Sequence, residues 1–365
     1  MCEELISILL PVHNGEKHIR HTIESVLSQT EAHWELIVVD DASTDGTAKI
    51  LDAFTDSRIT VYHNLQNEHI CYSLNTAAQL AKGQWIARID ADDFWYPQKL
   101  QQQLEYCREH PDCGACFTYV DVVDENDRVL KEKDSWFVPH FRVENQAQRE
   151  DWQRLLLTQG CRLCHPSVML RREAMQEGYQ LALVQIQDYE MWLRIAKRFS
   201  LHVLTTPLMA YRASQDSVSA RNQAVDRRSD YELGWMIAQY VREMPNADFA
   251  KVFGLKNVGA STPLDYACEK AFALLNKTLR APFYRMQALN QFAQLLQTDE
   301  GAKCLREKYS FRPVDFYRLS GEDAAHGQEW AGTAENLPIS VLLKAVCKKM
   351  LQKVGLLEIA KRMVK

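Results

Sequence analysis

The chain has 365 residues, of which 46% are hydrophobic, and a formal net charge of −5 at pH 7. This length and composition suit one large or two moderate domains with a buried core, and the negative charge argues against general nucleic-acid binding. The first residues lack the basic region and long apolar run of a secretory signal, and no stretch approaches the roughly 20 apolar residues that span a bilayer. Because the ten cysteines accompany no sign of export, we expect reduced thiols and a cytoplasmic protein.

The first part of the chain alternates between apolar runs and helical patterns. Strands are expected at 7–12, 34–39, 59–62 and 85–89, and the apolar spacing predicts intervening helices around 19–27, 50–54 and 74–81. Ser43 or Thr44 is placed to cap the second helix. Strand alternating with helix is typical of an α/β fold with a mostly parallel sheet covered by helices on both faces.

Polar side chains follow three of these strands. His13 follows the first, Asp40 and Asp41 end the second, and 90–93 (DADD) follows the fourth. Ligands of open α/β sheets bind outside the carboxyl ends of the strands, so these groups are expected to share one crevice. Clustered carboxylates repel one another, which favours a hard divalent cation, Mg²⁺ or Mn²⁺, that itself carries phosphate oxygens of a substrate.

The remainder of the chain continues this pattern and then becomes helical. We expect a helix to about residue 108, strands at 115–123, 164–170, 201–204 and 208–211, a loop at 131–150 able to move over the site, and a helix opened by Asp188. Helical patterns at 231–241 and 266–279 follow. The expected domains are therefore a catalytic α/β domain at 1–219, a helical region at 220–336 and a basic amphipathic tail helix at 337–365.

Five motifs occur in order within residues 6–219. They are LPVHNG at 10–15, VVDDASTDGT at 38–47, AKG at 81–83 ahead of DADD at 90–93, HPSVM at 165–169 and QDYEMWLR at 187–194. In combination they resemble family 2 glycosyltransferases of the GT-A fold, a Rossmann-like fold whose members use nucleotide-activated sugars and invert the anomeric centre. The resemblance implies an inverting glycosyltransferase that moves a sugar to a hydroxyl of a cell-surface glycan or a lipid-linked saccharide.

The resemblance also implies roles for individual residues. Asp92 matches the metal-binding aspartate of the DxD motif, Asp90 matches its partner that contacts the ribose or sugar, and Asp188 matches the general base. Displacing a nucleoside diphosphate needs charge neutralisation by a divalent ion and a carboxylate that takes the proton of the acceptor hydroxyl. His165 and Arg212 are candidates for acceptor or diphosphate contacts.

A second group of residues matches the nucleotide-binding positions. Asp41 matches the acid that accepts a hydrogen bond from the base, most often from uracil N3–H, which implies a UDP-linked donor. Pro11 and His13 match loop positions beside the nucleoside, where an aromatic ring often stacks. Asn14 and Ala91 complete this expected set.

Three departures from the family pattern motivate an alternative function. Gln187 stands where glutamate is usual, Ser214 where histidine is frequent, and His69 where glycine is usual. The alternative is a catalytically silent protein that binds sugar nucleotides or glycans on the same scaffold. A nucleotidyltransferase is disfavoured, because no glycine-rich, lysine-bearing phosphate loop occurs near the N-terminus.

Simpler structural roles remain open for several of these residues. Asp41 can cap the following helix, and Asp188 can be a carboxylate favoured by the helix dipole. Asp93 is expected to be structural, with capping of the helix after Pro97 as one role. His165 can be a hydrogen-bonded loop histidine.

Two CxxC pairs, at 113–116 and 161–164, have the spacing of structural zinc sites. Cys116 and Cys164 fall in expected strands, where alternation points neighbouring side chains to opposite faces. Buried free thiols are therefore favoured over zinc.

The C-terminal segment 338–365 carries seven basic residues against one acid. Its apolar residues form one helical stripe: Leu343, Val346, Met350, Val354 and Leu357. The segment is either a helix packed on the helical region or an interfacial helix attracted to anionic lipid. The second hypothesis suits a peripheral protein on the inner face of the cytoplasmic membrane.

Overall fold

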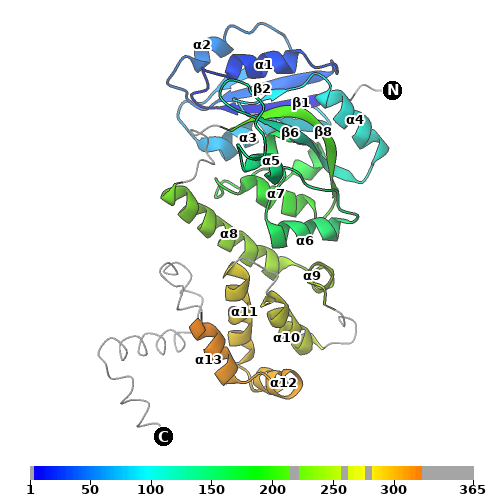
Figure 1. Cartoon of the computed structure of the whole chain (residues 1–365), viewed down its shortest axis with the longest axis vertical. Coiled ribbons are helices and arrows are strands. Elements are labelled where there is room, and N and C mark those ends of the chain that lie inside the picture. Colours follow the sequence, from blue (N-terminus) through cyan, green and yellow to red (C-terminus); the bar gives the residue numbers. More distant parts are fainter. Residues whose placement is uncertain (1–3, 214–221, 256–261, 276–281, 323–365) are drawn as a thin grey trace, which may run out of the picture. The chain divides into compact units, whose positions relative to one another are not determined.

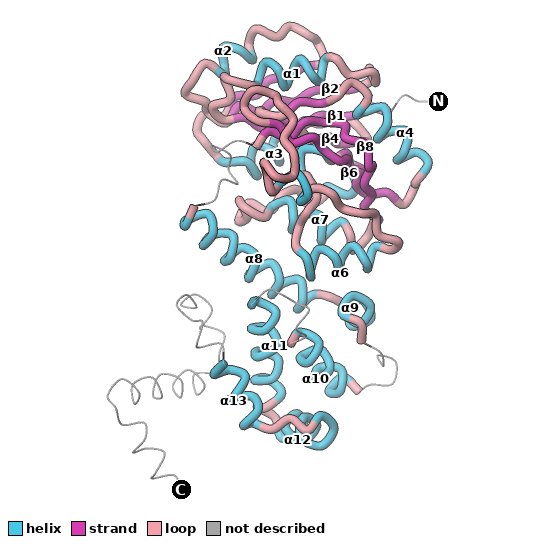
Figure 2. The backbone as a smooth tube through the Cα atoms, viewed as in Figure 1, coloured by secondary structure: helices cyan, strands magenta, loops and turns pink. Residues whose placement is uncertain are grey.

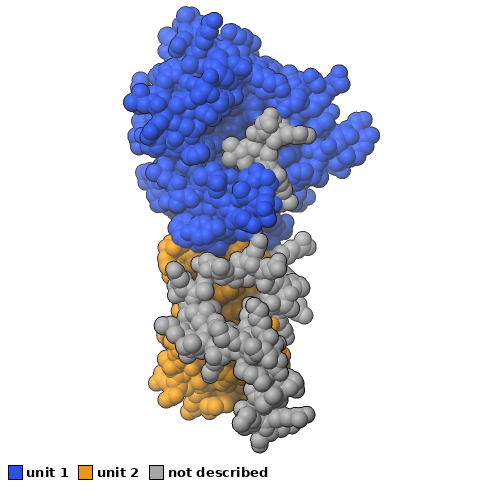
Figure 3. Space-filling model, turned by 90° about the vertical axis from the view of Figure 1, so that its left-hand side faces the viewer, with its two compact units in different colours: residues 1–236 blue, residues 237–365 orange. Residues whose placement is uncertain are grey.

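The computed structural model describes residues 4–213, 222–255, 262–275 and 282–322. The chain divides into two compact units, Met1–Met236 and Ile237–Lys365 (Figure 3). The division lies within helix α8 (Gln223–Glu243), downstream of the boundary expected at residue 219. The expected tail helix at 337–365 lies outside the described residues.

The first unit is built around an eight-stranded sheet with the order β3-β2-β1-β4-β7-β6-β8-β5 (Figures 1 and 2). The strands are β1 Ile6–Val12, β2 Trp34–Asp40, β3 Ile59–His63, β4 Trp85–Arg88, β5 Phe94–Trp95, β6 Cys113–Val123, β7 Met169–Arg171 and β8 Ser200–Arg212. Strands β3, β2, β1 and β4 pair in parallel, as do β6 and β8, whereas β7 is antiparallel to both of its neighbours and β5 is antiparallel to β8. The expected α/β fold with a mostly parallel sheet is confirmed.

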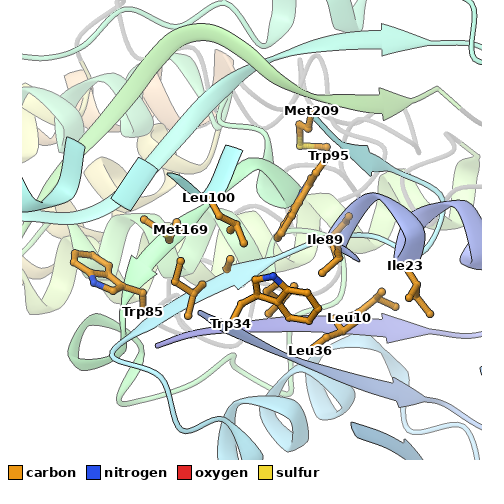
Figure 4. Packing of buried hydrophobic residues seen from close by; sticks show 14 of the residues in the cluster. Leu10, Ile23, Trp34, Leu36, Trp85, Ile89, Trp95, Leu100, Met169 and Met209 are labelled. Atoms are coloured by element: carbon orange, nitrogen blue, oxygen red, sulfur yellow. The ribbon is translucent and has the colours of Figure 1, made fainter. Parts of the chain in front are cut away.

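Helices cover both faces of this sheet. They are α1 Ile19–Leu27, α2 Thr47–Leu51, α3 His69–Leu80, α4 Lys99–Glu109, α5 Phe137–His140, α6 Arg149–Gln159 and α7 Gln187–Ile195. Alternate residues of β1 face opposite sides of the sheet, and Ile8 and Leu10 join a buried cluster with side chains of α1 and α4 (Figure 4). Helix α3 also packs on β1 and β2, but its buried Leu74 lies outside that cluster, which places α3 on the opposite face.

Three of the expected strands differ from those observed. The segment expected as a strand at 164–170 forms a 3-10 turn, His165–Ser167, before β7 begins at Met169. The reason is Pro166, whose fixed φ and missing N–H suit a turn and not a sheet interior. The strands expected at 201–204 and 208–211 form the single strand β8, because Pro207 lies at an irregularity of the β6–β8 register and is accommodated there.

The segment expected as a loop at 131–150 contains α5 and the start of α6. The pattern did not predict helix α6, because its buried apolar residues, Trp152, Leu156 and Leu157, stand among polar ones. The cap expected from Ser43 or Thr44 is also wrong, since α2 begins after Gly46 and the Asp45 carboxylate accepts from the backbone N–H of Thr47 at 2.9 Å.

The described part of the second unit is helical, as expected. It contains the end of α8 and the helices α9 Asn246–Phe253, α10 Pro263–Leu274, α11 Pro282–Leu295, α12 Asp299–Tyr309 and α13 Pro313–Glu322. Helix α10 starts with a capping box in which Thr262 and Asp265 satisfy each other's backbone N–H groups. The Lys308 ammonium on α12 pairs with Asp265 at 2.7 Å and ties the two helices together.

Candidate active site

The carboxyl ends of β1, β2 and β4 meet at one edge of the sheet. Val12, the last residue of β1, is the register partner of Asp40, the last residue of β2. The backbone N–H of Asp41 donates to Val12 O at 2.8 Å, and β1 pairs with β4 on its other side. The loops that carry His13, Asp41 and the DADD segment therefore leave the sheet side by side, as predicted.

The loop after β1 is locked to the loop after β2. His13 Nδ1 bonds to Asp41 O at 2.8 Å, Asn14 Oδ1 accepts from Thr44 N at 2.8 Å, and Asn14 N donates to Ser43 Oγ at 2.9 Å. Asn14 adopts a φ of 55°, a left-handed conformation that asparagine tolerates. His13 and Asn14 are exposed, so their polar groups are accessible to a nucleoside.

The resemblance matched Pro11 to a loop position, whereas the apolar run put it in the strand expected at 7–12. It lies within β1, where it is buried and paired with Val39. The missing N–H of Pro11 is tolerated because it faces the β4 side, where the pairing of β1 with β4 ends at Leu9.

Asp41 is 4% exposed, and its Oδ1 accepts from Asn64 Nδ2 at 2.6 Å and from Glu68 N at 2.9 Å. These bonds fix its carboxylate against the segment before α3, so the alternative in which Asp41 caps α2 is wrong. Asp40 has a separate role, because its Oδ2 bonds to His63 Nδ1 at 2.8 Å and raises the pKa of that imidazole.

The DADD segment is held by an arginine that the sequence motifs did not single out. Arg88 ends β4, is 3% exposed, and contacts both carboxylate oxygens of Asp90, with Nη2 2.5 Å from Oδ1 and Nη1 3.3 Å from Oδ2. A buried guanidinium requires such a partner. The available signal was an arginine inside an otherwise apolar strand directly before three acids.

Asp92 is partly buried within the same turn, as is Ala91. Burial, followed by repulsion from Asp90, raises the pKa of the Asp92 carboxyl to about 6. Among the described residues, no basic side chain forms an ion pair with Asp92. The guanidinium groups of Arg212 and Arg88 offset the rise only in part, so Asp92 lacks a direct counter-charge, which is the condition that favours a bound cation.

Arg212 fixes this turn from β8. Its Nε donates to Asp92 O and its Nη1 to Asp124 O, both at 2.8 Å, and its Nη2 lies 2.5 Å from Asp127 Oδ1. The side chain is 1% exposed. These contacts favour a role in shaping the Asp92 turn over the direct diphosphate contact expected for Arg212.

Asp93 belongs to the same assembly. Its Oδ1 accepts from the backbone N–H of Arg212 at 2.8 Å, and burial raises the pKa of its carboxyl well above the usual range. Asp93 is therefore structural, as expected. It does not cap α4, whose N-cap residue is Gln98.

Asp188 lies in the first turn of α7, which begins one residue earlier than expected. Its Oδ1 accepts from the backbone N–H of Tyr189 at 2.8 Å. Burial raises the pKa of the Asp188 carboxyl to about 6, while the Tyr189 N–H and the Arg88 guanidinium oppose that rise and Asp90 adds to it. Asp188 and the Arg88–Asp90 pair therefore share one electrostatic environment.

His165 is buried, and its Nε2 bonds to the Tyr179 hydroxyl at 2.8 Å. Burial, with a smaller contribution from Arg88, lowers the pKa of His165 well below its usual value, so the imidazole is neutral. His165 is therefore a buried, hydrogen-bonded histidine, the simpler structural role that the sequence left open. Tyr179 was not predicted, because it stands in no motif.

Two of the three family departures lie within the described residues. His69 opens α3 with a φ of 66°, the left-handed region that favours glycine, so the backbone keeps a glycine-like conformation there. Gln187 is buried and its Oε1 has no hydrogen-bond partner among the described residues. Ser214 lies outside them.

The cysteines of the two CxxC pairs are free thiols. Cys113 lies 3.8 Å from Cys107, sulfur to sulfur, and burial raises the pKa of Cys116 and Cys164. Within the described ranges, no three metal-binding side chains gather around one point. A cavity of about 770 Å³ lies between α3 and the β7 end that carries Arg171, and none of the candidate site residues lines it.

The chain was compared with known proteins. The family model described as Glycosyl transferase family 2 matches residues 7–178. A UDP-Glc:alpha-D-GlcNAc-diphosphoundecaprenol beta-1,3-glucosyltransferase, WfgD of Escherichia coli, is 32% identical over 225 residues, which cover 60% of this chain and 81% of the relative. The chain belongs to glycosyltransferase family 2. It is accordingly a glycosyltransferase that uses nucleotide sugars.

Further relatives agree with this family. A putative teichuronic acid biosynthesis glycosyltransferase, TuaG of Bacillus subtilis (strain 168), is 28% identical over 65% of this chain and 95% of its own length. The solved structure of S. aureus TarS 1–349 in complex with UDP-GlcNAc has a TM-score of 0.55 at 16% identity and covers 89% of this chain and 93% of that one. At that identity the likeness shows the fold alone. None of the described helices combines the length and hydropathy that a bilayer crossing requires.

Proposed function

We propose that this glycosyltransferase uses a UDP-linked donor and transfers a single hexosyl or acetamidohexosyl residue, with inversion, to a hydroxyl of a lipid-linked saccharide. The observation that carries the proposal is the electrostatic environment that Asp188 shares with the Arg88–Asp90 pair. It supports a catalytic base next to the DxD segment. The names of two relatives support the substrates: WfgD and WfaP of Escherichia coli are UDP-Glc-dependent enzymes that act on a GlcNAc-diphosphoundecaprenol.

In the proposed reaction Asp188 removes the proton from the acceptor hydroxyl as its oxygen attacks the anomeric carbon of the sugar. The bond from that carbon to the diphosphate breaks, and the nucleoside diphosphate leaves with the electron pair. A positioned base contributes about 10²–10⁴-fold to such a step. A pKa of about 6 suits this role, because the carboxylate is ionised at pH 7 and is still basic enough to accept a proton.

The nucleotide end of the site is assigned to the loops after β1 and β2. Asp41 would accept from uracil N3–H, with His13 and Asn14 beside the nucleoside and Asp90 and Ala91 near the ribose. The hydrogen bonds from Asn64 and Glu68 that fix the Asp41 carboxylate support this assignment.

A divalent cation fits the DADD turn. The Asp92 carboxylate has no ion-pair partner among the described residues and has a raised pKa, and Mg²⁺ and Mn²⁺ commonly bind through one or two carboxylates together with substrate phosphates. Asp92 would hold the ion, which supplies charge neutralisation on the departing diphosphate. A GT-A neighbour, the mannosyltransferase PcManGT of Pyrobaculum calidifontis, was solved in complex with GDP-Man and Mn²⁺ (TM-score 0.50, 18% identity).

An exposed aromatic group supports a saccharide acceptor. Trp136 is 58% exposed and stacks on Phe137, with 4.2 Å between ring centroids, and Phe137 contacts Tyr211 beside Arg212. Flat aromatic faces offer large apolar contact areas to ring-shaped ligands. Arg162 holds the other end of this segment by donating to His140 O at 3.1 Å.

The test of the donor is a screen of nucleotide sugars for thermal stabilisation with and without Mn²⁺, since a bound ligand stabilises by mass action. We expect UDP-linked sugars to give the largest shift, followed by transfer to a lipid-linked saccharide. Stabilisation without turnover, unchanged by Asp188→Asn, would support the alternative of a catalytically silent sugar-nucleotide binder.

The proposed location is the inner face of the cytoplasmic membrane, reached through the basic segment 338–365. The charge of that segment and the lipid-linked acceptors named for the relatives support it. A protein ending at residue 336 should lose binding to vesicles that contain anionic lipid. Equal binding by the shortened and the full chain would exclude the tail as a membrane anchor.

A further inference from the structure

Glu232 of α8 is a buried carboxylate with an unusual set of partners. The residue is 2% exposed, its Oε1 accepts from Val184 N at 3.0 Å, and its Oε2 accepts from Gln185 N at 2.8 Å and from Ile186 N at 3.1 Å. Three consecutive backbone N–H groups thus converge on one anion, the arrangement known as a nest. No basic side chain of the described residues forms an ion pair with Glu232.

The loop held in this way leads directly into the candidate base. Ile186 is the N-cap residue of α7, and Asp188 follows two residues later. The same loop is held from α3, where the Cys71 thiol donates to Leu183 O at 2.9 Å. A neutral side chain at position 232 would leave at least one of these three part-buried N–H groups without its acceptor, and the start of α7 would be free to shift.

We infer that Glu232 is a positioning residue for the transfer reaction: its carboxylate fixes the 184–186 loop and thereby holds Asp188 where it meets the acceptor hydroxyl. The inference rests on the proposed role of Asp188. Displacement of a reacting group by about 1 Å costs on the order of 10²-fold in rate, so the bonds to one side chain outside the site suffice to control turnover. Glu232 also lies beyond residues 7–178, the part matched by the family model.

The substitution Glu232→Gln tests this role, because it keeps the size of the side chain and replaces one accepting oxygen by an NH₂ group that faces N–H donors. We expect kcat to fall about 10- to 100-fold while KM for the donor stays within about twofold. Hydrogen exchange of the amides at 184–188 should become faster. Glu232→Asp, which keeps the charge, should recover part of kcat, and it serves as the test variant if Glu232→Gln does not fold.

Asp265→Asn provides the matched control. It neutralises another buried carboxylate that accepts a backbone N–H, in the capping box of α10, so it should lower thermal stability without changing kcat. In the Asp188→Asn background, Glu232→Gln should cause no further loss of rate, because the two residues act through one group.

Three results separate the possible failures. An unchanged kcat in Glu232→Gln, or a loss of rate that adds fully to that of Asp188→Asn, overturns the positioning role. The role is also overturned if the loss of kcat/KM in Glu232→Gln comes entirely from a higher KM for the donor, because that result indicates general damage to donor binding. A wild-type protein that transfers no sugar from any nucleotide donor refutes the proposed function instead.

Discussion

We expect the Asp188→Asn variant to lose about 10²- to 10⁴-fold in kcat and yet to be more stable than the wild type at neutral pH. Burial raises the pKa of the Asp188 carboxyl from 3.8 to about 6, so the folded protein disfavours the charged form that the proposed reaction requires. Asparagine has the same size, and its side-chain oxygen can still accept from the Tyr189 N–H. The substitution therefore removes the cost of the buried charge and leaves the local bonds in place.

The magnitude follows from the difference between the folded and unfolded pKa. A pKa difference of about 2 pH units corresponds to a free energy of about 3 kcal/mol as an upper bound. Because the Asp188 side chain is only partly buried, we expect Asp188→Asn to raise the free energy of unfolding by about 1–2 kcal/mol. The folded state binds more protons than the unfolded state between about pH 4 and 6. The cost of ionised Asp188 is thus absent below about pH 4, grows as the pH rises through 6, and is constant above it.

Thermal unfolding at pH 4.5 and pH 7.5 measures the difference in stability between Asp188→Asn and the wild type. For a unit of this size we expect the Asp188→Asn midpoint to exceed the wild-type midpoint by about 2–8 °C at pH 7.5, and by less at pH 4.5. Asp265→Asn is the control with the opposite sign, because the bond from Lys308 lowers the pKa of Asp265 to about 2 and its charge is stabilising at neutral pH. A midpoint below the wild-type value, or a gap that does not change with pH, would refute the reasoning.

Three further predictions follow from the same structure. The wild-type kcat should fall about tenfold for each pH unit below 6, as Asp188 becomes protonated, and a pH–rate profile checks this. Gly83→Ala should destabilise the fold by about 1–3 kcal/mol or more, since a Cβ there would lie 2.4 Å from Leu5 O; denaturant unfolding measures it. Trp136→Ala should raise KM for a saccharide acceptor about two- to tenfold and leave KM for the donor unchanged.

The sequence predicted most of the sheet because its central strands are buried on both faces and appear as uninterrupted apolar runs. Every residue of β1 is buried, for example. Helix α6 was not predicted because its three buried apolar side chains stand among polar residues. The sequence did not predict β8 as one strand, because Pro207 suggests a break unless the register of β8 with β6 is known.

The candidate site was predicted as far as its residues lie in local motifs. Asp41, Asp90 and Asp92 follow strand ends, and their convergence needs only the parallel arrangement. Arg212 was expected from the family resemblance, but its contacts depend on how β8 packs against the turn at 124–127, and no local pattern reveals that packing. Glu232 has no motif, and its importance appears only when α8 packs against the 184–186 loop.

The charges of the site bear on how the donor binds. The two guanidinium groups nearest the DADD turn are already engaged, Arg88 by Asp90 and Arg212 by Asp127, while Asp92 has no such partner. A nucleoside diphosphate brings further negative charge, so its phosphates would face carboxylates unless a cation is present. The nucleoside itself carries no charge, and its proposed contact is Asp41.

UDP should therefore stabilise the protein against thermal unfolding strongly with Mn²⁺ and weakly with a chelator, whereas the small effect of uridine should be the same in both. Asp92→Asn should abolish the effect of Mn²⁺ on UDP binding and leave uridine unaffected. If UDP bound the wild type equally well with a chelator present, its phosphates would be neutralised without a metal ion, by positive charge other than the engaged Arg88 and Arg212. The assignment of Asp92 as a metal ligand would then lose its basis.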